Sequence, residues 1–271
     1  MKLGVMPGET IPARELKSEG FDGMQLFWGM GDEATAKDPS VETIDSTLAG
    51  GDLALTAMTL HIDLVGPLGS IEAQVERTVH LVERTAALAG RFGDTPQPIL
   101  VWHPSGYPAG DGLDDVAVFD GLCSSLTTIC KAAETHGVQV AVEITRAGSV
   151  GSAETFLHLQ DRVGSTALKV CLDAANFVPD RTPLERAVRI LGPHTVIAHG
   201  KDSCFRDNGE VDTYGPIGSG RLDYDTYIKC LLAHTPVPYF VFEYYKTRDD
   251  LLRARDTVRA AMGAASVLSQ R

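Results

Sequence analysis

Residues 138–144 read VQVAVEI, and this stretch decides the fold more than any other. It follows a helical pattern at residues 114–136 that ends at Gly137, a residue suited to stop a helix. Side chains of a strand alternate between two faces, so the three valines share one face while Ala141 and Glu143 share the other. The pattern predicts a strand whose valines meet helices and whose last inward side chain is a carboxylate.

Seven further apolar runs alternate with helical patterns along the chain. Together with the first run they make eight candidate strands, at residues 3–6, 24–28, 55–61, 99–103, 138–144, 168–173, 195–199 and 239–244. Such alternation predicts parallel strands joined by helical crossovers. We therefore predict an α/β fold, a single (β/α)8 TIM-barrel domain over residues 1–271. A doubly wound open sheet is the rival fold, but residues 6–9, MPGE, lack its GxGxxG turn.

The composition narrows the class of protein. A net charge of −12 and a pI near 5.0 weigh against a nucleic-acid partner, because an acidic surface repels phosphate backbones. Five scattered cysteines without a CxxC pair favour a reducing compartment. We find no signal-peptide pattern and no uninterrupted apolar stretch of roughly 20 residues. We expect a cytoplasmic protein with a small-molecule partner and no membrane partner; the oligomeric state stays open, a homo-oligomer included.

Four consecutive candidate strands end on a side chain that can bind a metal ion. By the same alternation, these inward residues are Glu143, Asp173, His199 and Glu243. Barrel enzymes carry their active sites at the C-terminal strand ends, so we expect the four to meet. Three carboxylates around one axis repel one another unless they are protonated, paired or bridged by a cation. The set favours one divalent ion, with Mn²⁺ ahead of Mg²⁺, Co²⁺ or Zn²⁺.

Two histidines and a tryptophan end earlier candidate strands. His61 and His103 are expected at the barrel mouth. Each is either a polar rim residue or a residue that hydrogen-bonds the substrate or shuttles its protons. Trp28 is either a wall of the substrate pocket, which we favour, or a core residue that faces the helices.

The longest predicted loop spans residues 200–222, and loops of this length often bind ligands or act as lids. Lys201 and Arg206 in this loop either hold an anionic or hydroxyl-rich ligand or are solvated charges. The GSG run at residues 218–220 is a weak signal for a phosphate cradle. Asp223 or Asp225 is expected to cap the next helix.

These residues together resemble the xylose-isomerase-like barrel superfamily, and more closely its sugar phosphate isomerase/epimerase branch. The resemblance rests on VAVE at residues 140–143, CLD at 171–173, HGKD at 199–202, FE at 242–243 and GSGRLD at 218–223. It implies that Glu143, Asp173, His199 and Glu243 bind one divalent metal. It also implies that the two glutamates exchange protons with substrate carbons.

Two departures from the family pattern bear on function. Epimerases of the family often carry a histidine three residues after the strand-six aspartate, where this chain has Asn176. An asparagine can hydrogen-bond a sugar hydroxyl but cannot shuttle a proton. The related abasic-site endonucleases use that same histidine and an Asp-x-His further on, where residues 212–214 read DTY. The resemblance therefore argues against DNA repair.

Four functions remain, in decreasing order of preference. The first is a metal-dependent isomerase or epimerase of a sugar, sugar phosphate or keto-polyol, which abstracts a proton α to a carbonyl and passes through an enediolate. The second is a dehydratase or other lyase of a keto-sugar or keto-inositol that begins with the same proton abstraction. A non-catalytic sugar-binding barrel and an endonuclease-like nuclease follow.

Overall fold

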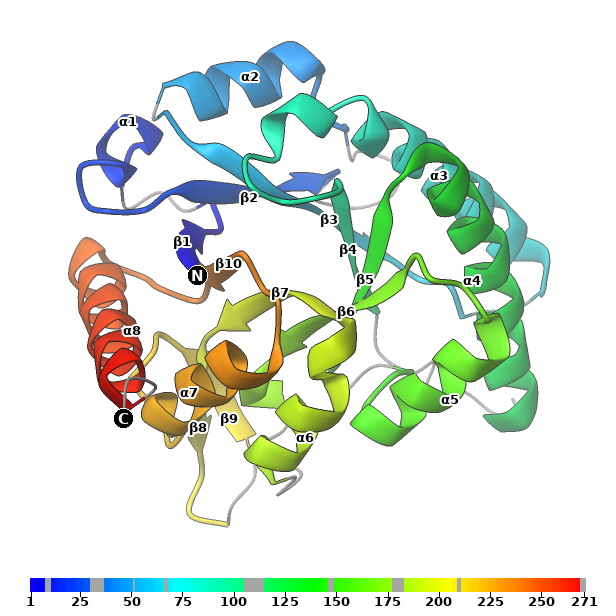
Figure 1. The fold of residues 1–271 in the computed structure, drawn as a ribbon. Helices are drawn as coiled ribbons and strands as arrows, with labels where there is room; N and C mark the ends of the chain where they lie inside the picture. The colour runs from blue at the N-terminus through cyan, green and yellow to red at the C-terminus, as the bar shows by residue number, and fades with distance from the viewer. Residues whose placement is uncertain are drawn as a thin grey trace.

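Eight parallel strands close into a barrel in the order β1-β10-β7-β6-β5-β4-β3-β2 (Figure 1). The computed structural model describes residues 1–7, 11–29, 37–50, 52–65, 68–104, 115–145, 149–176, 183–208 and 211–268. The barrel strands are β1 Lys2–Val5, β2 Gly23–Trp28, β3 Ala54–Ile62, β4 Ile99–Pro104, β5 Gln139–Glu143, β6 Leu168–Asp173, β7 Thr195–Gly200 and β10 Tyr239–Phe242. The predicted (β/α)8 fold is confirmed, and each barrel strand overlaps one of the eight predicted runs.

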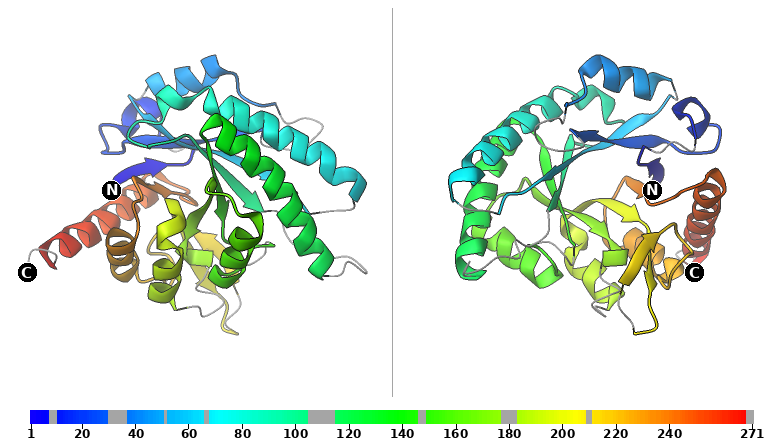
Figure 2. Two further views of the ribbon diagram at one scale, coloured as in Figure 1. Left: turned by 45° about the vertical axis from the view of Figure 1, so that its right-hand side comes forward. Right: turned by 180° about the vertical axis from the view of Figure 1, so that it is seen from behind.

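Helices form an outer layer around the barrel (Figures 1 and 2). They are α1 Ala13–Leu16, α2 Val41–Ala49, α3 Leu68–Ala86, α4 Asp115–His136, α5 Ala153–Val163, α6 Leu184–Leu191, α7 Tyr224–His234 and α8 Arg248–Leu268. Asp223 caps α7, since its carboxylate accepts the Thr226 amide at 3.1 Å. The first of the two candidate aspartates is therefore the cap that the helix uses.

Helix α4 has the length and apolar composition of a membrane span, which the sequence analysis did not anticipate. In the fold it lies in the outer layer, in contact with α3 and α5. Leu122, Leu126 and Ile129 on this helix are fully buried. Its apolar residues thus belong to the core between the barrel and the helices.

The register of the barrel brings the C-terminal ends of four strands to one edge. Across neighbouring strands, the paired residues are Glu143 with Cys171, Asp173 with His199, and Gly200 with Phe242. The amide of Glu243 donates to the carbonyl of Gly200 at 3.1 Å, so pairing continues one residue beyond β10. Residues 143, 173, 199 and 243 therefore all lie at the carboxyl ends of neighbouring strands.

The predicted loop after β7 begins as a two-stranded hairpin. β8 Asp202–Phe205 pairs antiparallel with β9 Val211–Gly215, and Figure 2 shows this hairpin in yellow beside the barrel. The Asp202 carboxylate accepts hydrogen bonds from the amides of Gly218 and Leu222, each at 3.1 Å. A Cβ atom on Gly220 would collide with this carboxylate, so only glycine fits there. The glycine-rich run at residues 218–220 thus packs around the buried side chain of Asp202.

Candidate active site

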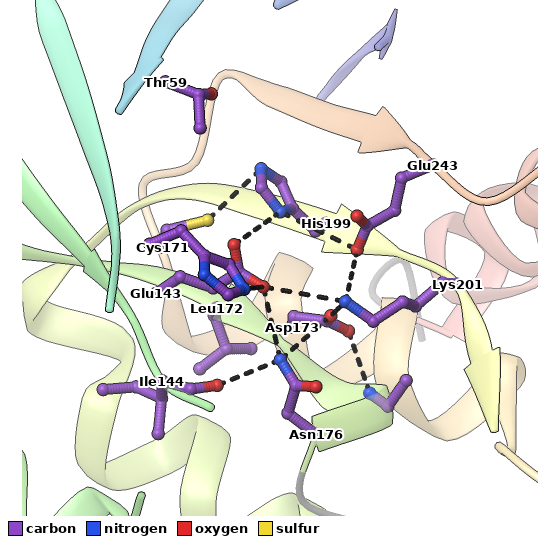
Figure 3. A network of polar contacts seen from close by, with 12 residues as sticks. Thr59, Glu143, Ile144, Cys171, Leu172, Asp173, Asn176, His199, Lys201 and Glu243 are labelled. Carbon is purple, nitrogen blue, oxygen red and sulfur yellow. Dashed lines mark hydrogen bonds and ion pairs between the residues drawn. The ribbon is translucent and has the colours of Figure 1, made fainter. Parts of the chain in front are cut away.

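The carboxyl edge of the barrel gathers Glu143, Asp173, His199 and Glu243 into one buried cluster (Figure 3). Strands β5, β6 and β7 supply the first three, and Glu243 follows β10 directly. One oxygen from each of the three carboxylates lies within 4.8 Å of the others, close enough to share one ion. The structure thus brings together all four residues that the sequence predicted would meet.

The imidazole of His199 is oriented by a chain of polar side chains inside the barrel. Its Nε2 lies 3.1 Å from Oε1 of Gln25, whose own amide donates to the Thr59 hydroxyl at 2.7 Å. Because that amide end is used as a donor, Oε1 is the acceptor and the His199 proton belongs on Nε2. The sulfur of Cys171 lies 3.3 Å from the same nitrogen.

The other nitrogen of His199 has no hydrogen-bond partner among the residues that the structure describes. Nδ1 is completely buried and lies 3.6 Å from Glu143 Oε2 and 3.9 Å from Glu243 Oε1. A buried nitrogen lone pair that faces two carboxylates is costly unless a cation lies between them. The donor set and its orientation therefore fit a divalent ion held by one imidazole and the neighbouring carboxylates.

Lys201 is also part of the cluster, contrary to the alternative of a solvated loop charge. Its ammonium contacts Asp173, lies 2.7 Å from Glu243 Oε1 and 3.6 Å from Glu143 Oε1, and the residue is 4% exposed. The rings of two tyrosines lie around it, with centroids 5.0 Å away for Tyr214 and 5.2 Å for Tyr244. One ammonium faces three carboxylates, so the cluster retains an excess of acidic groups that an ion could neutralise.

Burial and charge set the ionisation of the cluster. Burial raises the pKa of Asp173 to about 7, although the nearby ammonium of Lys201 acts to lower it. Burial raises the pKa of Glu243 in the same way. Burial would also raise the pKa of Glu143, but Lys201 and then His199 outweigh it and lower that pKa to about 2. Burial lowers the pKa of the Lys201 ammonium, yet the carboxylates hold it well above its ordinary value.

Asn176 lies beneath the carboxylates rather than free to meet a substrate. It ends a short 3-10 turn, Ala174–Asn176, and its amide nitrogen lies 3.3 Å from Glu143 Oε1 and 3.1 Å from Asp173 Oδ2. The same nitrogen also lies 3.1 Å from the carbonyl of Ile144. The geometry gives Asn176 the role of a positioning residue for two candidate ligands.

The two histidines of β3 and β4 lie side by side at the mouth. The rings of His61 and His103 stack with centroids 4.6 Å apart, and His103 Nε2 lies 3.9 Å from Glu143 Oε1. Burial and then the neighbouring His103 lower the pKa of His61 to about 4. His61 is therefore neutral at pH 7 and can hydrogen-bond a ligand without adding charge.

Two predicted substrate residues lie away from the cluster. Trp28 faces the helices, since its indole N–H donates to the Thr85 hydroxyl of α3 at 3.0 Å and Arg84 covers its ring. The reason is the period of β2: Gln25 and Phe27 point inward, so Trp28 must point outward. Arg206 is exposed on the hairpin and pairs with Asp212 at 2.7 Å. The favoured pocket-wall interpretation of Trp28 is wrong.

Sequence reasoning overlooked Gln25 and the position of the Lys201 ammonium. Both follow the alternation that found the other residues, because Gln25 precedes inward-facing Phe27 by two and Lys201 follows His199 by two. The two tyrosines around the ammonium gave no such signal. Tyr214 comes from β9, and Tyr244 has an unusual positive φ of 58° that no sequence period predicts.

The fold and the site together define the class of protein. It is a closed (β/α)8 barrel with a candidate divalent-metal site, formed by carboxylates and an imidazole at the carboxyl edge of the strands. The chain belongs to the Xylose isomerase-like TIM barrel family, which it matches over residues 13–264. This confirms the resemblance that the sequence motifs indicated. The family consists mostly of metal-dependent enzymes.

Solved structures share the fold at low sequence identity. D-Psicose 3-epimerase from Clostridium cellulolyticum H10, crystallised with D-tagatose, is 14% identical over 98% of this chain and 99% of that chain, with a TM-score of 0.72. The probable 3-DHS dehydratase AsbF of Bacillus anthracis is 17% identical over 95% of this chain and 97% of that chain, with a TM-score of 0.70. A Xylose isomerase-like TIM barrel protein of Mycobacterium smegmatis in complex with magnesium is 19% identical over 93% of this chain and 87% of that chain, with a TM-score of 0.68. No curated protein matches the sequence.

Proposed function

We propose that this protein is a divalent-metal-dependent isomerase or epimerase of a sugar, sugar phosphate or keto-polyol. The observation that carries the proposal is Nδ1 of His199, which is buried, faces Glu143 and Glu243, and has no hydrogen-bond partner within the described part of the chain. Glu143, Asp173, His199 and Glu243 would hold the ion, with Mn²⁺ preferred over Mg²⁺, Co²⁺ or Zn²⁺. When bound, the ion would polarise the substrate carbonyl and stabilise the negative charge of an enediolate.

The strand order supports separate proton-transfer roles for the two glutamates. Along the barrel, β10, β7, β6 and β5 are neighbours, so Glu243 and Glu143 lie at the two ends of the arc and His199 and Asp173 between them. A substrate bound against this arc meets a carboxylate from two sides. One glutamate would remove the proton α to the carbonyl, and the other would return a proton to the opposite face or the neighbouring carbon.

Proton exchange with solvent is the most direct test. With Mn²⁺ in D₂O, we expect deuterium at the carbon beside the carbonyl of at least one ketopentose, ketohexose or keto-inositol, detected by NMR and mass spectrometry. Glu143→Gln and Glu243→Gln should each slow this exchange about 100-fold or more. Asp212→Asn removes an exposed hairpin carboxylate and serves as the control that should retain activity. Full exchange by both glutamine variants would exclude the proposed proton transfers.

A dehydratase is the second candidate. Asn176 stands where epimerases of the family often have a histidine, and the fold is shared with the probable 3-DHS dehydratase. The first step would be the same proton abstraction, after which a β-hydroxyl leaves as water. Product mass separates the two functions, because an isomer keeps the mass of the substrate and dehydration lowers it by one water.

A further inference from the structure

A cavity opens beside the candidate active site, between β2, helix α2 and the segments that follow β1 and β10. Its volume is about 650 Å³, and Glu243 is one of its lining residues. The apolar part of its wall includes Met6, Pro7, Leu26, Phe27, Ile44 and Tyr245. Because Glu243 belongs to both the cavity and the carboxylate cluster, a ligand could occupy the two at once. We call this cavity the α2 pocket.

Three hydroxyl groups on the wall of the α2 pocket, those of Thr43, Thr47 and Tyr245, already have partners within the protein. The Thr47 hydroxyl donates to the carbonyl of Thr43 at 2.8 Å, and the Thr43 hydroxyl lies 3.2 Å from that of Ser40. The Tyr245 hydroxyl donates to the carbonyl of Met6 at 2.5 Å. Apart from Glu243, Lys37 is the only charged residue among the described lining residues. The pocket therefore suits an apolar group better than a second polyol.

The size of the α2 pocket also exceeds the needs of a small sugar. Its volume is in the middle of the range, roughly 300–1,000 Å³, of pockets that enclose drug-sized ligands. A free hexose would fill a fraction of it and would leave the half-buried Phe27 against water. An aromatic ring attached to the sugar would instead cover the apolar wall contributed by β2 and α2.

From this arrangement we propose that the α2 pocket binds an aromatic substituent of the substrate, whose polyol part lies at the carboxylate cluster. The substrate class is then an aryl-substituted sugar or keto-sugar rather than a free monosaccharide. This inference rests on the proposed function for the polyol end and on the α2 pocket alone for the aromatic end. Glu243 marks the junction between the two parts.

Matched pairs of methyl and phenyl glycosides test the proposal without any turnover. Dissociation constants for the methyl and phenyl β-glycosides of D-glucose, D-galactose and D-xylose are measured by calorimetry on the full chain, with and without Mn²⁺. Burial of a phenyl ring predicts binding about tenfold tighter, or more, for the phenyl member of at least one pair. Saturation-transfer NMR should show the strongest protein contact at the aromatic protons.

Helix α2 offers a matched pair of variants. Thr47 lines the pocket, Ser46 does not, and the hydroxyls of both donate to the same Thr43 carbonyl. Thr47→Phe should fill the pocket and abolish the preference for phenyl, while Ser46→Phe should retain it. Thermal melts report folding, and Thr47→Leu replaces the phenylalanine variant if that variant does not fold.

The outcomes distinguish this proposal from the proposed function. Equal affinity within each pair, or the same loss of preference in both phenylalanine variants, would overturn the α2 pocket as the aromatic site. A phenyl preference that Thr47→Phe abolishes, without deuterium exchange in any keto-sugar, would keep the pocket and remove the isomerase. Exchange in free ketoses without a phenyl preference would support the isomerase and overturn the α2 pocket as the aromatic site.

Discussion

The ammonium of Lys201 lies among the same carboxylates that would hold a metal ion. It contacts Asp173 and Glu243 and is enclosed by Tyr214 and Tyr244. The hydroxyl of Tyr224 donates to the Lys201 carbonyl at 2.6 Å, which fixes the backbone at this point. Lys201 therefore stabilises the acidic cluster and also repels any cation that enters it.

At the scale of this residue, Lys201→Met should affect metal binding and stability in opposite directions. Without a metal, the buried carboxylates lose their counter-charge, and the free energy of unfolding should fall by about 3–5 kcal/mol. The affinity for Mn²⁺, measured by calorimetry, should rise about tenfold or more because a like charge is gone. Lys229→Met on the exposed face of α7 is the control. Weaker Mn²⁺ binding by the Lys201 variant would mean that Lys201 organises the ligands instead of competing with the ion.

At the scale of the elements, alternate residues of β2 contact the barrel interior and the outer helices. Gln25 points inward and orients His199, whereas Trp28 points outward and donates to Thr85 in the last turn of α3. The Thr85 hydroxyl in turn donates to the Leu81 carbonyl at 2.7 Å. The strand that orients His199 thus also contacts the outer layer, through a buried hydrogen bond from its tryptophan and through the Arg84 guanidinium that covers the tryptophan ring.

Removal of this hydrogen bond should destabilise the barrel. Thr85→Val keeps the size of the side chain but leaves the buried indole N–H of Trp28 without an acceptor, at a cost of about 1–3 kcal/mol in urea unfolding. Thr85→Ser retains the hydroxyl and should unfold at a urea concentration nearer that of the wild type. If the two variants are equally destabilised, packing of the methyl group and not the hydrogen bond holds β2 to α3.

At the scale of the whole molecule, a metal ion would join strands that are far apart in the chain. Its four candidate ligands span residues 143 to 243, and β10 closes the barrel against β1 at the N-terminus. Any ion that binds only the folded barrel must stabilise all of it. The effect should be visible in global unfolding and not in one element alone.

Addition and removal of metal should shift the melting temperature. At 100 times its dissociation constant an ion adds about 2.7 kcal/mol, which for a chain of this size corresponds to roughly 5–10 °C. We expect this rise with Mn²⁺ in differential scanning calorimetry, its reversal by EDTA, and its loss in Glu243→Gln. An unchanged melting temperature with Mn²⁺, Mg²⁺, Co²⁺ and Zn²⁺ alike would contradict the metal site.

Local periods in the sequence determined the barrel and the residues at its strand ends. The two-residue alternation of β5 and β6 is sufficient to turn Glu143 and Asp173 inward, and the succession of strands and helices is sufficient to predict parallel strands joined by helical crossovers. These properties depend on neighbours in the chain, so the sequence alone predicts them.

The tertiary structure alone decided how these residues are used. The contact of Lys201 with Asp173, the hydrogen bond from Asn176 to Glu143, and the α2 pocket join segments that are separated in the chain. Their positions depend on strand register, on the short turn after β6 and on the positive φ of Tyr244, none of which has a period that can be read from the sequence. A buried charge takes whichever partner the closed barrel brings within reach, and closure is a property of the whole chain.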